Sequence, residues 1–151
     1  MIPSSKAASI ISRWTDGLSA RDQTTDWVNL HTKDVTWTDH AFQLWREGHA
    51  GVINHAKIWR GAIPEFKIEA KTIWQEESLP GGKTRIVCPT QNTGTFVSDL
   101  PAVKASGKAF WFPGVIDFVI QDEDGLIESM NEYYTFIFHG VNSINGYERK
   151  E

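Results

Sequence analysis

The sequence contains a single cysteine, Cys88, among its 151 residues. One thiol cannot form an intrachain disulfide, and a metal centre built from cysteines needs several of them. Cys88 has no evident base partner, so it is interpreted as a buried structural thiol. The scarcity of cysteine therefore excludes a disulfide framework and a cysteine metal site.

Long apolar runs and clusters of positive charge are also absent. No segment reaches the length that a membrane-spanning helix needs, and the N-terminal residues lack the apolar core of a signal peptide. The formal net charge is −4, and no run of four basic residues occurs. We therefore expect neither a membrane nor a nucleic acid as partner, and a cytoplasmic location.

Aromatic residues, in contrast, are abundant, with seven tryptophans and eight phenylalanines. One interpretation is a well-packed core, which composition alone favours. The other is an apolar cavity lined with rings, able to hold a flat or polycyclic ligand. Composition leaves both interpretations open.

Helical periodicity dominates the first part of the chain and strand alternation the rest. The first helix carries one apolar stripe, made of Ala7, Ile10, Ile11, Trp14 and Leu18. A short second helix and a third helix ending before Pro64 follow, and residues 66–75 then alternate as one half-buried strand. Later strands are expected over residues 83–96, 108–121 and 126–138. This order predicts a single α+β domain over residues 1–151. Its curved, cone-shaped antiparallel sheet forms an α+β barrel with three helices on the concave face.

Three acidic residues have apolar neighbours, which makes them candidates for chemistry. Asp39 ends the segment WTD, Asp117 interrupts GVIDFVI, and Glu132 lies in SMNEYY. A carboxyl group in an apolar site either finds a partner or stays protonated. A protonated acid beside an ionised one is the arrangement that general acid–base catalysis needs. The alternative for each acid is a position that faces water or pairs with a lysine or arginine.

Several segments resemble one family. Residues 115–134 (VIDFVIQDEDGLIESMNEYY) resemble the last hairpin of the ketosteroid isomerases, and residues 10–22, 34–39 and 46–59 resemble earlier elements. These isomerases belong to the nuclear transport factor 2-like superfamily, with the SnoaL-like polyketide cyclases, limonene epoxide hydrolase and scytalone dehydratase. The middle, residues 92–108, is similar to the SnoaL-like cyclases but lacks the histidine of their GTH-type motif.

The resemblance implies roles for particular residues. The isomerase's general base falls on Asp39, and its oxyanion-hole acid, which an apolar site keeps neutral, falls on Asp117. Its oxyanion-hole tyrosine falls on Trp14, whose indole N–H can donate a hydrogen bond but cannot release its proton as a phenol can. Glu132 is the third catalytic candidate. The expected substrate-binding residues are Trp14, Trp37, His40, Asn92, Val119, Met130 and Tyr134.

The expected function is a cofactor-independent isomerase or cyclase. It would act on a small, mostly apolar, possibly polycyclic carbonyl compound in natural-product biosynthesis. Two alternatives stay open: an epoxide hydrolase or dehydratase of the same fold that uses Asp117 and Glu132, and a non-catalytic binding or dimerisation module. No metal is expected, because the histidines show no metal-ligand spacing, and His55 is interpreted as a core residue. A homodimer is expected through a sheet face carrying Ile116, Phe118 and Ile120, which the chain's own C-terminal segment could equally cover.

Overall fold

The computed structural model describes residues 4–20, 25–101 and 103–135. Within these residues the chain forms three helices: α1 (Ser4–Ser19), α2 (Thr25–Val28) and α3 (Gly48–Ala62). It also forms seven strands: β1 (His31–Asp39), β2 (Leu44–Glu47), β3 (Lys67–Ala70), β4 (Gln75–Leu79), β5 (Lys83–Thr95), β6 (Ala109–Gln121) and β7 (Ile127–Tyr134). None of the described helices is long and apolar enough to cross a membrane.

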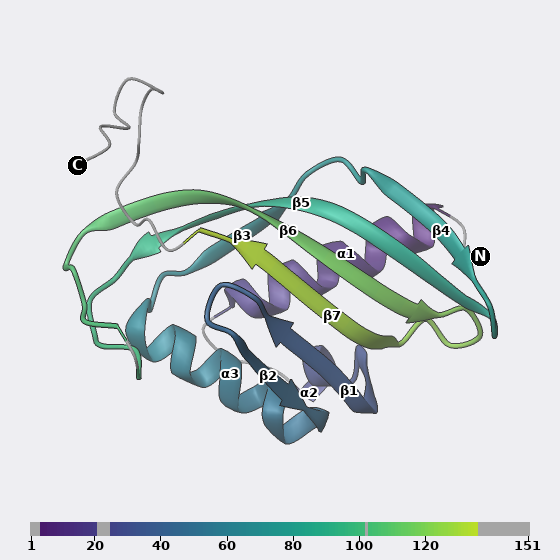
Figure 1. Ribbon diagram of the computed structural model, residues 1–151, viewed down its shortest axis with the longest axis horizontal. Coiled ribbons are helices and arrows are strands. Elements are labelled where there is room, and N and C mark those ends of the chain that lie inside the picture. The colour runs from purple at the N-terminus through teal and green to yellow at the C-terminus, as the bar shows by residue number, and fades with distance from the viewer. Residues whose placement is uncertain (1–3, 21–24, 102, 136–151) are drawn as a thin grey trace, which may run out of the picture.

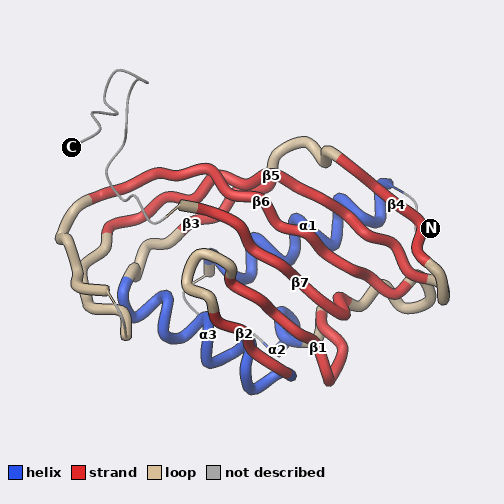
Figure 2. Tube along the Cα trace, viewed as in Figure 1, coloured by secondary structure: helices blue, strands red, loops and turns tan. Residues whose placement is uncertain are grey.

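The strands form one curved, mostly antiparallel sheet in the order β2-β1-β7-β6-β5-β3, and β4 pairs with β5. The long strands β5 and β6 arch over the helices, and α3 lies under the end of the arch that is opposite the N-terminus (Figures 1 and 2). The predicted α+β class with a curved sheet is confirmed. The expected barrel is not closed, because β2 and β3 end the sheet without pairing with each other in the described chain.

The helices are held to the sheet by the apolar stripes that the sequence shows. All five stripe residues of α1 are buried, and so are Val52, Ala56 and Trp59 on α3. Trp14 lies at the centre, with its ring edge-on to Trp37 and to Phe118 at centroid distances of 5.5 and 5.3 Å. The aromatic-rich composition therefore builds, first of all, a dense core between α1 and the sheet.

Two local expectations are corrected. Residues 66–75 do not form one strand, because the chain leaves the sheet between β3 and β4. There Trp74 keeps a backbone hydrogen bond to Val87 while its ring is 68% exposed. The strand β2 was not expected, since its four residues carry too few β-forming side chains to signal a strand. The predicted last strand ends at Tyr134 in the described chain, and residues 136–138 lie outside it.

The two faces of β6 decide where the chemistry can lie. Ile116, Phe118 and Ile120 are at most 1% exposed and face the helices. The expected outer apolar row is therefore the inner one, and the argument for a homodimer from this row is lost. A homodimer stays a prediction. Because successive strand residues point to opposite faces, Asp117 and Val119 lie on the outer face of the sheet.

Candidate active site

The site begins with the pairing of two strands that are far apart in the sequence. β1 runs parallel to β7, and Asp39 lies opposite Glu132 in the register. Glu132 is in turn opposite Ile116 of β6, so both acids are on the inner face of the sheet. Asp39 is 1% exposed and Glu132 is 8% exposed. Two carboxyl groups are thus buried side by side, facing the helices.

Asp39 is held by two donors that stabilise its ionised form. The Tyr134 hydroxyl donates to Oδ2 at 2.7 Å, and the Phe42 backbone N–H donates to Oδ1 at 3.0 Å. Burial raises the pKa of Asp39, and these hydrogen bonds act in the opposite direction. Burial and the nearby acids raise the pKa of Tyr134, which keeps its proton on the phenol oxygen. Asp39 is therefore the member of the pair that ionises first.

Glu132 is the member that keeps its proton. Burial, together with the charge of Asp39, raises the pKa of Glu132 to about 8. The Trp37 indole N–H donates to Oε2 of Glu132 at 2.7 Å and only partly offsets this rise. At neutral pH the pair therefore holds one negative charge and one transferable proton.

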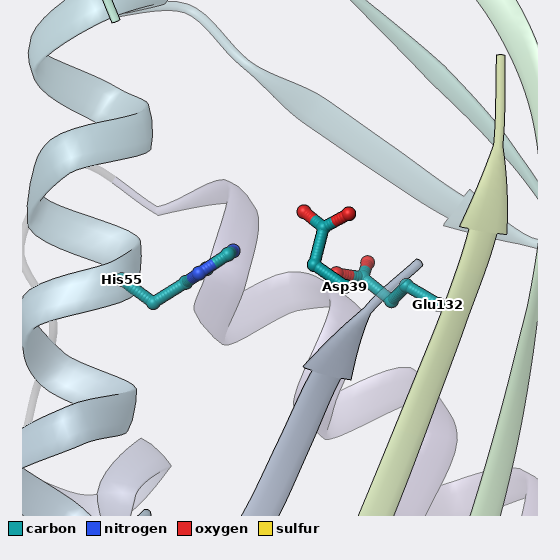
Figure 3. Close-up of side chains that lie close together, drawn as sticks. All are labelled: Asp39, His55 and Glu132. Atoms are coloured by element: carbon teal, nitrogen blue, oxygen red, sulfur yellow. The ribbon is translucent and has the colours of Figure 1, made fainter. Parts of the chain in front are cut away.

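His55 of α3 completes the cluster (Figure 3). One carboxylate oxygen each from Asp39 and Glu132 and one ring nitrogen of His55 all lie within 4.8 Å of one another. Burial, with a smaller contribution from Arg46, lowers the pKa of His55 to about 4, so the imidazole is neutral. Its ring packs against Trp37 at a centroid distance of 4.3 Å. The sequence placed His55 on the inner face of its helix, but gave no sign that two acids face it.

The spacing of the three groups allows a single atom to contact all of them. Because the three atoms are at most 4.8 Å apart, a point between them is at most about 2.8 Å from each, which is within hydrogen-bond distance. A substrate oxygen or a water could occupy it. One imidazole and two carboxylates are also ligands that a divalent cation accepts. The absence of a metal therefore stays a prediction. The spacing of histidines along the sequence no longer supports it, because folding brings one histidine and two acids together.

Two neighbouring hollows adjoin the cluster. A cavity of about 130 Å³ is lined by Asp39, Phe42, Leu44, Arg46, His55, Ile58, Trp59, Leu100 and Pro101. A smaller space of about 10 Å³ is lined by Leu18, Trp37, His55, Trp59, Phe66, Asn92, Phe112, Glu132 and Tyr134. His55 and Trp59 line both. Asp39 thus lines the larger cavity, and Glu132 lines the smaller space.

The prediction that Asp117 shares a pocket with Asp39 is wrong. Asp117 pairs with Asn131 and Val87 across the sheet, one residue out of phase with the inner row. Its two oxygens accept hydrogen bonds from the Arg85 guanidinium, at 2.9 and 2.6 Å. Asp117 therefore lies on the outer face and is paired with an arginine. This is the alternative that the sequence left open for each of the three acids.

The expected substrate-binding residues separate into three groups. Trp37, Asn92 and Tyr134 line the smaller space beside Glu132. His40 and Val119 lie on the outer face, where His40 stacks on Tyr133 and contacts Asn131, so they do not reach the cavities. Trp14 and Met130 are core residues that line neither cavity.

Trp14 also has its hydrogen-bond donor already engaged. Its indole N–H donates to Nε2 of His31 at 3.1 Å, while Nδ1 of His31 lies 3.0 Å from the Val28 carbonyl oxygen. Burial lowers the pKa of His31 to about 4, which fits a neutral ring that accepts from Trp14. Trp14 therefore positions Trp37 by packing, and the oxyanion-hole role that the resemblance implied is not available to it.

Comparison with known proteins agrees with this fold. Residues 11–130 match the model of the SnoaL-like domain. A search of curated protein sequences found no significant match. A protein from Jannaschia sp. CCS1, assigned as a SnoaL-like polyketide cyclase, is 16% identical, with a TM-score of 0.65 over 86% of this chain and 85% of its own.

Two other solved structures show the same fold. A type 2 hexachlorocyclohexane dehydrochlorinase is 15% identical, with a TM-score of 0.72 over 93% of this chain and 95% of its own. A protein with a ketosteroid isomerase-like fold from Catenulispora acidiphila is 16% identical, with a TM-score of 0.58 over 91% and 90%. At these identities the likeness shows the fold alone. The family resemblance seen in the sequence is confirmed, and because the matched model covers most of its residues, the chain belongs to the SnoaL-like domain family.

Proposed function

We propose that this protein is a cofactor-independent acid–base enzyme of the isomerase or cyclase type, acting on a small carbonyl compound. The observation that carries the proposal is the pair of buried, adjacent carboxyl groups, Asp39 and Glu132, of which Asp39 lines a largely apolar cavity. The pKa of Glu132, raised by burial and by the charge of Asp39, supports opposite protonation states for the two acids. General acid–base catalysis needs a base and an acid that coexist at one pH, and separation of two pKa values by environment supplies them.

In the proposed reaction, the Asp39 carboxylate removes a proton from the carbon next to the substrate carbonyl. The developing enolate oxygen receives a hydrogen bond, or the proton, from the neutral Glu132. Asp39 then returns its proton to a different carbon, which gives an isomer. In a cyclisation, the enolate carbon instead forms a bond to the carbon of a second carbonyl of the same molecule, whose C=O π bond breaks, and the resulting alkoxide takes the proton that Asp39 removed. Either route starts and ends with the same protonation states.

Other residues hold these two groups in place. Tyr134 fixes one oxygen of Asp39, and Trp37 fixes one oxygen of Glu132. The neutral His55 faces both acids and can donate to, or accept from, the substrate oxygen. The role first given to Asp117, a neutral acid that donates to an oxyanion, is thus assigned to Glu132.

The cavity volume favours a smaller substrate than the sequence led us to expect. A volume of about 130 Å³ is close to that of an engineered cavity, about 150 Å³, that holds one benzene ring. A compound with one ring fits this space. The proposed substrate is therefore monocyclic or an equivalent open chain, and a place in natural-product biosynthesis is retained as part of the proposal.

The test uses cyclohex-3-en-1-one, whose conversion to the conjugated enone is followed by ultraviolet absorbance. Asp39→Asn removes the base without changing shape, so kcat/KM is expected to fall by about 10²- to 10⁴-fold. Asp117→Asn, on the outer face, is the matched control and is expected to keep wild-type turnover. Turnover that survives in well-folded Asp39→Asn refutes the assignment, and binding without turnover in the wild type favours a non-catalytic module.

Elimination is a second candidate, favoured by the neutral His55 beside the acid pair. His55 could take the proton while Glu132 protonates a leaving hydroxyl group, and one structural neighbour carries the name of a dehydrochlorinase. The compound 3-hydroxycyclohexanone loses water to give the same conjugated enone, so one absorbance reports both reactions. Preference for this compound, with a greater loss in His55→Gln than in Asp39→Asn, would favour elimination over isomerisation.

A further inference from the structure

Arg46 lines the larger cavity and has no hydrogen-bond or ion-pair partner among the residues that the structure describes. It lies opposite Trp37 in the β1–β2 register, and so on the inner face of the sheet. Its Nε is buried and has no hydrogen-bond partner, and the guanidinium forms no ion pair with any acid in the described chain. Arg60 of α3, by contrast, donates to the Leu18 and Gly17 carbonyl oxygens.

A second donor in the same cavity is also unused. The indole Nε1 of Trp59 is buried and has no hydrogen-bond partner within the described residues. Trp59 lines both hollows and Arg46 lines the larger one. Buried N–H groups are nearly always satisfied in folded proteins, so two orphans around one cavity indicate a missing acceptor.

Asp39 and His55 also line the cavity, and the remaining wall is apolar, formed by Phe42, Leu44, Ile58, Leu100 and Pro101. These two polar residues do not satisfy the orphan donors: the oxygens of Asp39 receive hydrogen bonds from Phe42 and Tyr134, and neither Arg46 Nε nor Trp59 Nε1 bonds to His55. A ligand that satisfies this wall therefore has an apolar body and an oxygen-rich, acceptor-only group. A carboxylate has that character, and its single charge matches one guanidinium, which binds carboxylates with two parallel hydrogen bonds.

We propose that the substrate carries a carboxylate and that Arg46, assisted by Trp59, binds it. The inference rests on the proposed function and narrows its substrate class to small carbonyl compounds with one carboxylate. A substrate carboxylate near Asp39 also raises the pKa of Asp39, because two negative charges repel each other, and this makes Asp39 a stronger base. Arg46 determines specificity and takes no proton.

Benzoate and benzamide are suitable probes, because they share one ring and differ in charge. Binding is measured by protein-detected NMR titration, which requires no turnover. The wild type is expected to bind benzoate at least tenfold more tightly than benzamide. Arg46→Met is expected to weaken benzoate binding by about 10- to 100-fold and to leave benzamide binding unchanged. Arg13→Met, which removes an exposed arginine from α1, is the control and should bind as the wild type does.

Three outcomes overturn the proposal: equal affinity for benzoate and benzamide, equal loss of both in Arg46→Met, or the same loss in Arg13→Met. If Arg46→Met does not fold, Arg46→Lys keeps the charge without the two-pronged geometry, and a reduced preference for benzoate is then expected. Failure of the Asp39→Asn test with an intact Arg46-dependent preference refutes the proposed reaction alone. The reverse pattern refutes the carboxylate alone.

Discussion

Replacing Glu132 by glutamine should change how the stability of the protein depends on pH. Burial and the charge of Asp39 raise the pKa of Glu132 from 4.5 to about 8, so the folded chain retains a proton that the unfolded chain releases. The stabilisation is complete below pH 4.5 and is lost as the pH rises to about 8. The slope is at most about 1.4 kcal/mol for each pH unit and is smaller close to either pKa, so wild type should lose about 3.5 kcal/mol relative to Glu132→Gln between pH 5 and pH 8.

The measurement is urea denaturation of both proteins at pH 5, 6.5 and 8, followed by tryptophan fluorescence. Contributions from other titrating groups are largely shared and cancel in the difference. Glu128→Gln is the matched control on the same strand, because Lys83 contacts Glu128 at 2.6 Å and lowers its pKa. Its effect should be flat over this range. If the difference between wild type and Glu132→Gln is equally flat, Glu132 does not hold the proton and the acid–base assignment fails.

Four further outcomes are expected. Tyr134→Phe removes a donor to Asp39, so the pKa of Asp39 should rise and the acidic limb of the kcat/KM profile should move up by about one pH unit; an unmoved limb contradicts this. His55 has a pKa of about 4 in the fold against 6.5 ordinarily, so wild type should lose about 3 kcal/mol between pH 6.5 and pH 4, and His55→Gln should be spared most of that loss. Asp117→Asn should change the free energy of unfolding by about 1 kcal/mol or less, because the Arg85 side chain is 44% exposed; a larger loss would show a structural role. Turnover should survive EDTA, and its loss would show that the three-residue cluster holds a cation.

The sequence carries enough information for the architecture but not for the inner face of β6. The α1 stripe and the change from helical to alternating periodicity predict helices packed on a curved sheet. Around Asp117, however, both rows of the strand are apolar, so alternation alone cannot tell which row faces the helices. The register with β7 decides it, and a shift of one residue exchanges the two faces.

The candidate site was only half visible for a similar reason. Asp39 and Glu132 could be proposed one by one from their apolar neighbours, but their adjacency depends on a parallel pairing between distant strands. His55 is predicted to lie on the inner face of its helix, but its place in the site depends on the two acids that face it in the fold. Arg46 gave no signal, because it lies in a strand of four residues that was not expected at all.

The pairing of β1 with β7 also sets the order in which this protein can become functional. Asp39 is present early in synthesis, whereas Glu132 and Tyr134 come from the last strand in the described chain. Until β7 is inserted between β1 and β6, the base lacks both its hydroxyl donor and its partner acid. A chain interrupted before β7 would keep the three helices and most of the core residues, but Asp39 would lack the acid that the proposed reaction pairs with it. Such long-range strand pairing closes late and slowly in folding. The proposed activity therefore requires that β7 has paired with both β1 and β6.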